Sequence, residues 1–369
     1  MFDMQDFRYE IALPLIDGVG LTNAKHLIEH YGTAQEAFAD SDNLMADMIR
    51  STIGPDSEKN AALRRAEQEL KFIDKHHIRV TYYKDEDYPY RLRECIDAPI
   101  LLYGLGNYDY NCQYVLSVVG TRQPTDRGRE LCRQLVTDLA RLIPGVLIVS
   151  GLAYGIDVTA HRAALDAGLP TLIIPAHGLD RIYPAVHRNV AMQAVQYGGI
   201  LTEFISGTTP ERQNFVQRNR IIAGLADAVV VVESKLKGGS LITAEMANSY
   251  SRDVFAFPGR VGDEVSAGCN KIIKHDKARM IETAEDLIVN MMWEQVKQIK
   301  PLQTELIVDL EPDEKLVMDS LHQMPDGMHV NQLVGEVKIA YSALSALIFT
   351  MEMKGFVKQL PGGMVRALK

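Results

Sequence analysis

Three turns near the middle of the chain combine glycine with hydroxyl and cationic side chains, a pattern that can bind phosphate. Glycine lets backbone N–H groups approach an anion closely, and the planar guanidinium of arginine matches the geometry of a phosphate group. We therefore predict phosphate binding at Gly120-Thr121-Arg122, at Ser150-Gly151 with Gly155, and at a lysine-glycine turn made of Lys235, Lys237, Gly238, Gly239 and Ser240.

Two further segments add cations and an aromatic ring. Arg181, Tyr183 and Arg188 lie close together in the sequence, and Arg218 and Arg220 enter an apolar helix. Single-stranded nucleic acid is commonly bound in a cationic groove where bases stack on aromatic rings. We predict that these arginines contact the nucleic-acid backbone, with one of the last two pointing into the cleft and the other organising the loops. Tyr183 would supply a stacking surface. Alternatively, Tyr183 and Pro184 form a turn with a purely structural role.

The elements that must position these turns read as alternating strands and helices. Short apolar, β-branched segments are expected to be strands at 115–119, 146–149, 171–174, 200–202, 228–232 and 254–256, with a further strand at 78–83. Such alternation predicts a parallel sheet with helices on both faces, which is an α/β, extended Rossmann-like core. Ligands of such sheets bind where the carboxyl ends of the strands enter the turns.

The chain divides into four predicted parts. Residues 1–76 form a helical module whose Asp17-Gly18-Val19-Gly20 turn resembles a helix-hairpin-helix, or a SAM-like packing module that needs no ligand. Residues 77–290 form the Rossmann-like domain, 291–310 a linker and 311–369 a winged helix. The last assignment rests on helices expected at 312–322, 329–337 and 341–354, followed by strands at 356–360 and 364–366.

Composition excludes several classes of protein. The net charge of the 369 residues is −9, which does not favour coating duplex DNA through general electrostatics, so any nucleic-acid site must be local. The four cysteines lack CxxC spacing, so neither a metal site nor a disulfide framework is expected. No stretch of about 18 apolar residues occurs, and the start of the sequence is not a secretory signal, so we expect a cytoplasmic protein that contacts no membrane.

Nucleotide-binding motifs are incomplete in this sequence. The turn from Gly151 to Gly155 is too short for a Walker A loop, and no intact Gly-x-Gly-x-x-Gly follows the first strand of the core. A dinucleotide-binding regulator is therefore a weak alternative.

Asp157 is expected to cap the next helix or clamp its loop, and His161 is expected to be the partner of Asp157 or a packed residue.

Taken together, these motifs resemble the DNA-processing protein A family, also called DprA or Smf. The resemblance rests on their order and spacing: Gly120-Thr121-Arg122, Ser150 to Asp157, Gly178-Leu179-Asp180 with Tyr183-Pro184, Arg218 to Leu225, Gly239 to Ala244 and Phe257-Pro258-Gly259. It implies a dimeric, non-catalytic recombination mediator without a cofactor, which binds single-stranded DNA in natural transformation and loads the RecA recombinase. Val216, His187 and Ser251 depart from residues common in the family.

Two alternatives stay open. The segment Gly238 to Glu245 is similar to the Gly-Gly-x-Gly-Thr-x-x-Glu loop of nucleotide phosphoribohydrolases, in which Glu245 would be catalytic, although Leu241 replaces a glycine of that loop. The expected recognition helix of the winged helix carries no Lys or Arg before Lys354. Because groove reading needs basic and polar side chains, we expect this unit to serve protein contact, self-association or regulation rather than binding to duplex DNA.

Overall fold

The computed structural model describes residues 7–39, 56–294, 310–324 and 327–368, and it forms two compact units, residues 1–296 and 297–369. Of the predicted linker, 291–310, residues 295–309 lie outside the described residues. The first unit begins with helices: α1 (Arg8–Ala12), a 3-10 helix (Leu13–Leu15), α2 (Gly20–Tyr31), α3 (Ala34–Ala39) and α5 (Asp56–His76). The predicted glycine turn precedes α2, and Gly18 and Gly20 have positive φ angles of 79° and 59°.

A nine-stranded sheet follows, in the order β1-β2-β6-β5-β4-β3-β7-β8-β9. Its strands are β1 (Arg79–Tyr82), β2 (Leu101–Gly106), β3 (Val115–Val119), β4 (Leu147–Ser150), β5 (Thr171–Ile173), β6 (Gly199–Thr202), β7 (Ala228–Val231), β8 (Asp253–Ala256) and β9 (Arg279–Met280). Strands β3 to β9 pair in parallel, as predicted for this segment. β1 and β2 add an antiparallel extension to β6, and neither β2 nor β9 was predicted.

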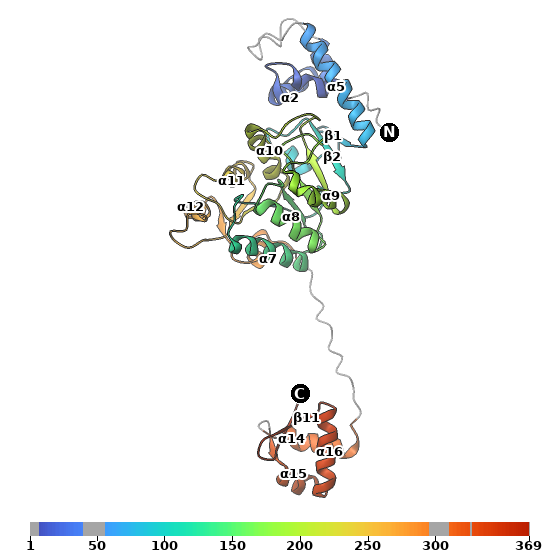
Figure 1. Cartoon of the computed structure of the whole chain (residues 1–369), viewed down its shortest axis with the longest axis vertical. Coiled ribbons are helices and arrows are strands. Elements are labelled where there is room, and N and C mark those ends of the chain that lie inside the picture. Colours follow the sequence, from blue (N-terminus) through green and yellow to red (C-terminus); the bar gives the residue numbers. More distant parts are fainter. Residues whose placement is uncertain (1–6, 40–55, 295–309, 325–326, 369) are drawn as a thin grey trace. The chain divides into compact units, whose positions relative to one another are not determined.

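Helices cover both faces of this sheet (Figure 1). Leu116 and Val118 of β3 face α7 (Asp126–Leu142), α8 (Ile156–Asp166) and α13 (Ala284–Met291). Val115 and Val119 pack in the cluster of α10 (Arg212–Leu225), α11 (Gly239–Ser249) and α12 (Ala267–Lys274). A short α6 (Tyr90–Arg93) and α9 (Arg188–Tyr197) complete the unit. Because β3 is buried on both faces, its five apolar and small residues form a continuous run.

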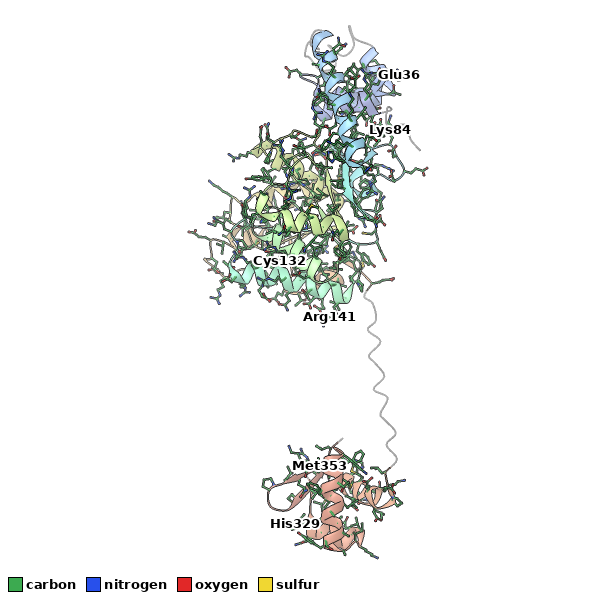
Figure 2. The ribbon with its side chains drawn as sticks, turned by 45° about the vertical axis from the view of Figure 1, so that its right-hand side comes forward. Glu36, Lys84, Cys132, Arg141, His329 and Met353 are labelled. Carbon is green, nitrogen blue, oxygen red and sulfur yellow. The ribbon has the colours of Figure 1, made fainter. Side chains whose placement is uncertain are left out.

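The N-terminal helices are tied to the sheet by packing and by hydrogen bonds. Their apolar residues belong to the same cluster as Val115 and Val119. Lys84, which follows β1 and is labelled in Figure 2, donates to the carbonyl of Gly32 at the end of α2 (3.1 Å). The helical module and the sheet therefore share one hydrophobic core rather than forming independent domains.

The second unit has the predicted winged-helix elements. These are α14 (Pro312–His322), β10 (Met328–His329), α15 (Val330–Val337), α16 (Tyr341–Met353), β11 (Val357–Leu360) and β12 (Met364–Ala367), with sheet order β10-β12-β11. Met353 lies at the end of α16 and is exposed (Figure 2). In the described ranges no single helix is long and apolar enough to span a membrane, although α15 and α16, bent by 108°, meet the length and hydropathy criteria as a pair.

Candidate nucleic-acid interface

The predicted glycine turns meet at the carboxyl ends of the parallel strands. β3 runs into Gly120, β4 into Gly151 and β7 towards Glu233, and strand order reverses at β3, where ligands of open α/β sheets bind. The amide of Thr121 donates to the carbonyl of Glu233 (2.7 Å), and the amide of Ile156 donates to the carbonyl of Thr121 (3.2 Å). Backbone hydrogen bonds therefore join the turns after β3, β4 and β7 into one surface.

Two glycines allow these turns to pack. Gly155 has φ 82°, and a Cβ there would lie 2.3 Å from the carbonyl oxygen of Thr121. A Cβ on Gly151 would lie 1.9 Å from Nη1 of Arg218. Both distances are far below van der Waals contact, so no side chain fits at either position without displacing a neighbour.

Arg218 places a buried cation beneath the turn after β4. The residue is 3% exposed, its guanidinium donates to the carbonyl of Ile174, and its Nε has no hydrogen-bond partner among the described residues. Burial lowers the pKa of Arg218 to about 10, while Asp157 opposes that shift. Burial also raises the pKa of Asp157, which accepts from the amide of Ala153 (3.3 Å) and so clamps the loop as predicted. An anion at the Gly151 turn would lie next to a positive charge that is weakly screened by water.

A ring of Phe215 lies among the predicted cations. The guanidinium carbon of Arg122 is 5.1 Å from the centroid of this ring, and that of Arg218 is 5.8 Å away. The ring of Tyr183 meets Phe215 edge to face at 6.2 Å between centroids. Arg122 is exposed and has no ion-pair partner among the described residues. These four residues, which we call the Phe215 cluster, combine charge with aromatic surface, as single-strand binding requires.

A second aromatic residue stands in the turn after β4. Tyr154 is 51% exposed, and its ring meets that of buried His187 edge to face at 5.0 Å. His187 is held in turn, with Nδ1 2.9 Å from the carbonyl oxygen of Leu152. Neither Phe215 nor Tyr154 was among the predicted site residues. Phe215 precedes Arg218 by three residues, which puts both on one helix face, and Tyr154 lies inside a turn already predicted to bind phosphate.

Three predicted hydroxyls are used inside the protein. Ser150 donates to the carbonyl of Val118 (2.6 Å), and Ser240 donates to the hydroxyl of Ser234 (2.8 Å). The hydroxyl of Thr121 accepts from the amide of Gln123 (3.2 Å). Ser150 and Ser240 are buried, so their hydroxyls hold the turns together instead of facing a ligand, contrary to our prediction.

Arg220 has the loop-organising role predicted for one of the two helix arginines, and not the phosphate contact that was also predicted for it. It is 7% exposed, its guanidinium forms an ion pair with Glu203, and it donates to the carbonyl of Asp97. Burial raises the pKa of Glu203 to about 6, although the charge of Arg220 acts in the opposite direction. Residues two apart on a helix point to opposite sides of it. Arg218 therefore lies under the turns, while Arg220 ties α10 to the loop before β2. Arg220 is therefore removed from the candidate contacts.

The remaining predicted cations lie at the surface. Lys235, Lys237 and Arg188 are exposed and make no ion pair with the described residues. Arg181 donates to Asp180 through Nε (2.9 Å) and Nη2 (2.7 Å). Gly238 is the N-cap of α11, and Gly239 is its first residue, so the two lysines precede a helix N-terminus that favours anions.

The N-terminus of α7 is already occupied by a carboxylate. Thr125 is its N-cap, and Glu233 accepts hydrogen bonds from both the amide and the hydroxyl of Thr125, each 2.8 Å long. In dinucleotide-binding Rossmann domains the pyrophosphate sits at the corresponding helix N-terminus. A buried glutamate there repels such a group, which weakens the dinucleotide alternative further.

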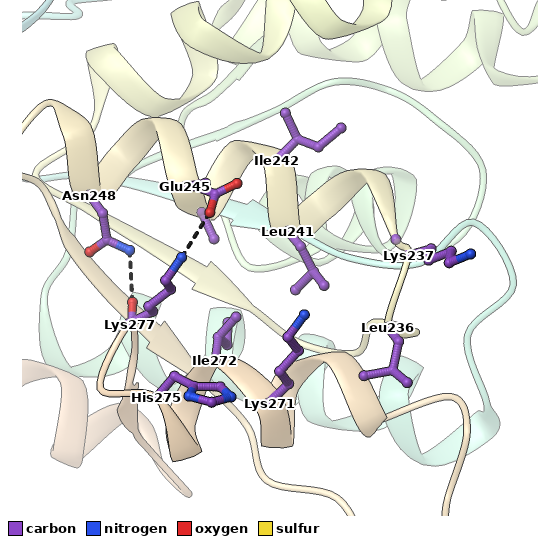
Figure 3. A pocket seen from close by; sticks show the side chains of 12 residues that line it. Leu236, Lys237, Leu241, Ile242, Glu245, Asn248, Lys271, Ile272, His275 and Lys277 are labelled. Carbon is purple, nitrogen blue, oxygen red and sulfur yellow. Dashed lines mark hydrogen bonds and ion pairs between the residues drawn. The ribbon is translucent and has the colours of Figure 1, made fainter.

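Glu245 lies in a pocket of about 520 Å³ between α11 and α12 (Figure 3). Its carboxylate accepts from Lys277 (2.8 Å), and this contact lowers the pKa of Glu245. Of the residues that line the pocket, Glu245 is the only carboxylate, and Lys237, Lys271 and His275 are among the others. A general acid needs a raised pKa, so this environment does not suit Glu245 for that role and leaves the phosphoribohydrolase alternative only a role as base or nucleophile.

His161 is a packed residue on α8, one of the two roles expected for it. Its Nδ1 lies 2.7 Å from the hydroxyl of Thr171, which donates to the carbonyl of Ile148 (2.9 Å), so Nδ1 carries the proton. Burial lowers the pKa of His161 to about 3, and Arg218 contributes to the shift. The imidazole is therefore neutral in the folded protein.

We expect this histidine to make the first unit less stable in mild acid. An unfolded histidine gains a proton near pH 6.5, whereas His161 resists protonation down to about pH 3, so the stability it contributes at neutral pH is lost as pH falls through that window. The loss between about pH 7 and pH 5 is about 2 kcal/mol. Urea unfolding of wild type and His161→Asn, followed by Trp293 fluorescence, measures it: the stability difference should shrink towards pH 5, and parallel pH profiles would contradict the prediction.

Comparison with known proteins places this geometry in a family. The family model described as DNA recombination-mediator protein A matches residues 79–292, which include the whole surface described above. The chain belongs to this family. A second model, described as the DprA winged helix domain, matches residues 302–363.

Relatives from several bacteria support this membership. Protein Smf of Synechocystis sp. is 31% identical over 398 residues, covering 96% of this chain and 97% of that protein. DNA processing protein DprA of Streptococcus pneumoniae is 38% identical over 204 residues, covering 55% of this chain and 71% of that protein.

Two solved structures of the family have the same fold. DprA of Streptococcus pneumoniae has a TM-score of 0.63 at 29% identity and covers 78% of this chain and 98% of that structure. DprA of Helicobacter pylori, described for its single-stranded DNA binding mode, has a TM-score of 0.53 at 29% identity and covers 59% of this chain and 97% of that structure. The extended Rossmann-like core with a terminal winged helix is thereby confirmed.

Proposed function

We propose that this chain binds single-stranded DNA at the carboxyl edge of its sheet and acts, without catalysing a reaction, as a recombination mediator in natural transformation. The observation that carries the proposal is the Phe215 cluster. It puts an exposed guanidinium, which has no ion-pair partner among the described residues, and two aromatic rings beside interlocked glycine turns. The relative from Helicobacter pylori binds single-stranded DNA, and its structure has the same fold.

Several features favour a single strand over a duplex. Tyr154 and Tyr183 are 51% and 47% exposed, so their rings are accessible to unpaired bases. Arg122, Arg188 and the two lysines before α11 offer separated phosphate contacts, which suit a continuous backbone better than one nucleotide. With a net charge of −9, the chain has no general attraction for duplex DNA.

The test is a competition experiment with a fluorescent oligonucleotide. Anisotropy of a labelled single strand should rise with protein, and unlabelled single strands of mixed sequence should compete better than the matching duplex. Binding should weaken steeply as salt increases, because phosphate contacts release counterions. Equal competition by duplex DNA would argue against the proposal. Base release from nucleoside monophosphates that disappears in Glu245→Gln would favour the enzyme instead.

Dimer formation and loading of the RecA recombinase complete the proposal, and both rest on membership of the family. Light scattering at several protein concentrations measures the oligomeric state. Stimulation of RecA filament formation on single strands that carry a single-strand-binding protein measures loading. A monomer at all concentrations, or no stimulation by a protein that binds DNA, would remove these two parts and leave the DNA-binding proposal intact.

We expect Tyr154→Ala to weaken single-strand binding by about tenfold, because base stacking on an exposed ring contributes about 1–3 kcal/mol. Tyr154→Phe keeps the ring and should bind like wild type. Quenching of 2-aminopurine in the oligonucleotide reports stacking directly. Equal affinity of the Ala and Phe variants would show that this ring does not contact bases.

A further inference from the structure

Helix α5 makes a buried connection to the loop between β6 and α10. Oε1 of Glu69 accepts from the amide of Ser206 (2.9 Å), and Oε2 accepts from its hydroxyl. Arg65, one turn earlier, donates to Oε2 of Glu69 (2.9 Å) and to the carbonyl of Ser206. The side chain of Glu69 is only 3% exposed, so its charge depends on these donors. Ser206 is thus held to α5 through its amide, its hydroxyl and its carbonyl.

The same loop holds the segment that carries Arg181. The amide of Gly207 donates to Oδ1 of Asp180 (2.9 Å), while Oδ2 of Asp180 accepts from Arg181. Gly178 packs against the loop so closely that a Cβ would lie 2.3 Å from the carbonyl oxygen of Ile205. Asp180 therefore binds the loop through one carboxylate oxygen and binds the guanidinium of Arg181 through the other.

We propose that Glu69 is a positioning residue for DNA binding: it fixes the Ser206 loop, which through Asp180 orients Arg181 at the edge of the sheet. This inference rests on the proposed function and adds a role for the N-terminal helical module. The module contributes to the affinity for DNA through a chain of hydrogen bonds, without contact between α5 and the DNA. A side chain whose orientation is fixed before binding loses less entropy when the phosphate arrives.

A double-mutant cycle tests the connection. Glu69→Ala should weaken single-strand binding about fivefold and Arg181→Ala about tenfold. The double variant should bind no more weakly than Arg181→Ala alone, because both changes remove the same contact, that of Arg181 with DNA. The losses of Glu69→Ala and Arg122→Ala should multiply, since Arg122 is not reached through this loop. Glu69→Gln keeps an acceptor for the amide of Ser206 and should recover part of the affinity.

Hydrogen exchange and a control on the same helix complete the test. Amides of residues 203–209 should exchange faster in Glu69→Ala than in wild type. Glu67→Ala removes an exposed carboxylate of α5 that pairs with Arg8, and it should change neither exchange nor binding. If the losses of Glu69→Ala and Arg181→Ala multiply, or if Glu69→Ala leaves affinity and exchange unchanged, the inference is wrong. A wild-type protein that binds no single strand would instead defeat the proposed function.

Discussion

The double variant Arg122→Ala/Lys237→Ala should bind single-stranded DNA at least about 100-fold more weakly than the wild type. Each change removes an exposed cation at a different turn of the surface, and a charge-assisted hydrogen bond to phosphate contributes about 1.5–3 kcal/mol. Two fewer phosphate contacts should also lower the slope of log affinity against log salt by about 1.4. Anisotropy titrations between about 50 and 200 mM salt measure both quantities.

The control for this variant has the same change in net charge. Arg133→Ala/Lys71→Ala removes two exposed cations from α7 and α5, away from the glycine turns. It should keep wild-type affinity within about twofold and the same salt slope, because screened surface charges act weakly at a distance. If the control loses as much affinity as the double variant, general electrostatics explains binding and the proposed surface does not.

Replacement of Arg220 by Ala should destabilise the first unit by about 3–5 kcal/mol at neutral pH, because it leaves Glu203 buried without its partner. The loss should be smaller near pH 5. The pKa of Glu203 is raised to about 6 even with Arg220 present, so without the guanidinium the carboxyl takes up a proton at higher pH and its charge is removed. Urea unfolding monitored by the single tryptophan, Trp293, reports this unit, since Trp293 is packed on Tyr114.

Two further variants separate the buried pair from a general effect of charge removal. Arg133→Ala breaks an ion pair whose side chains are 52% and 65% exposed, and it should cost less than about 1 kcal/mol. Arg220→Met/Glu203→Gln removes both charges and should recover part of the stability. A double variant no more stable than Arg220→Ala would indicate that lost packing around the Arg220 side chain, and not an unpaired carboxylate, causes the instability.

Much of the fold could be predicted because the strands of the core carry their own signal. β3 and β7 are runs of buried apolar and small residues, since helices cover both faces of the sheet. Seven of the nine strands lie where the sequence predicts them. β9 has only two residues, too few for a periodic pattern. β2 contains Gly104 and Gly106 after a proline-containing approach, which resembles a turn more than a strand. Its strand conformation comes from pairing with β1 and β6.

The sequence by itself determined which turns could accept phosphate, since glycine beside arginine or lysine is a local property of the chain. Only the tertiary structure decided the role of each side chain. Arg218 and Arg220 are two residues apart, yet one lies beneath the Gly151 turn and the other in a buried ion pair. Ser150 and Ser240 point inward because buried hydroxyls need partners. Phe215 meets Arg122 across nearly a hundred residues of sequence. Such contacts depend on how helices and strands pack, which no local pattern records.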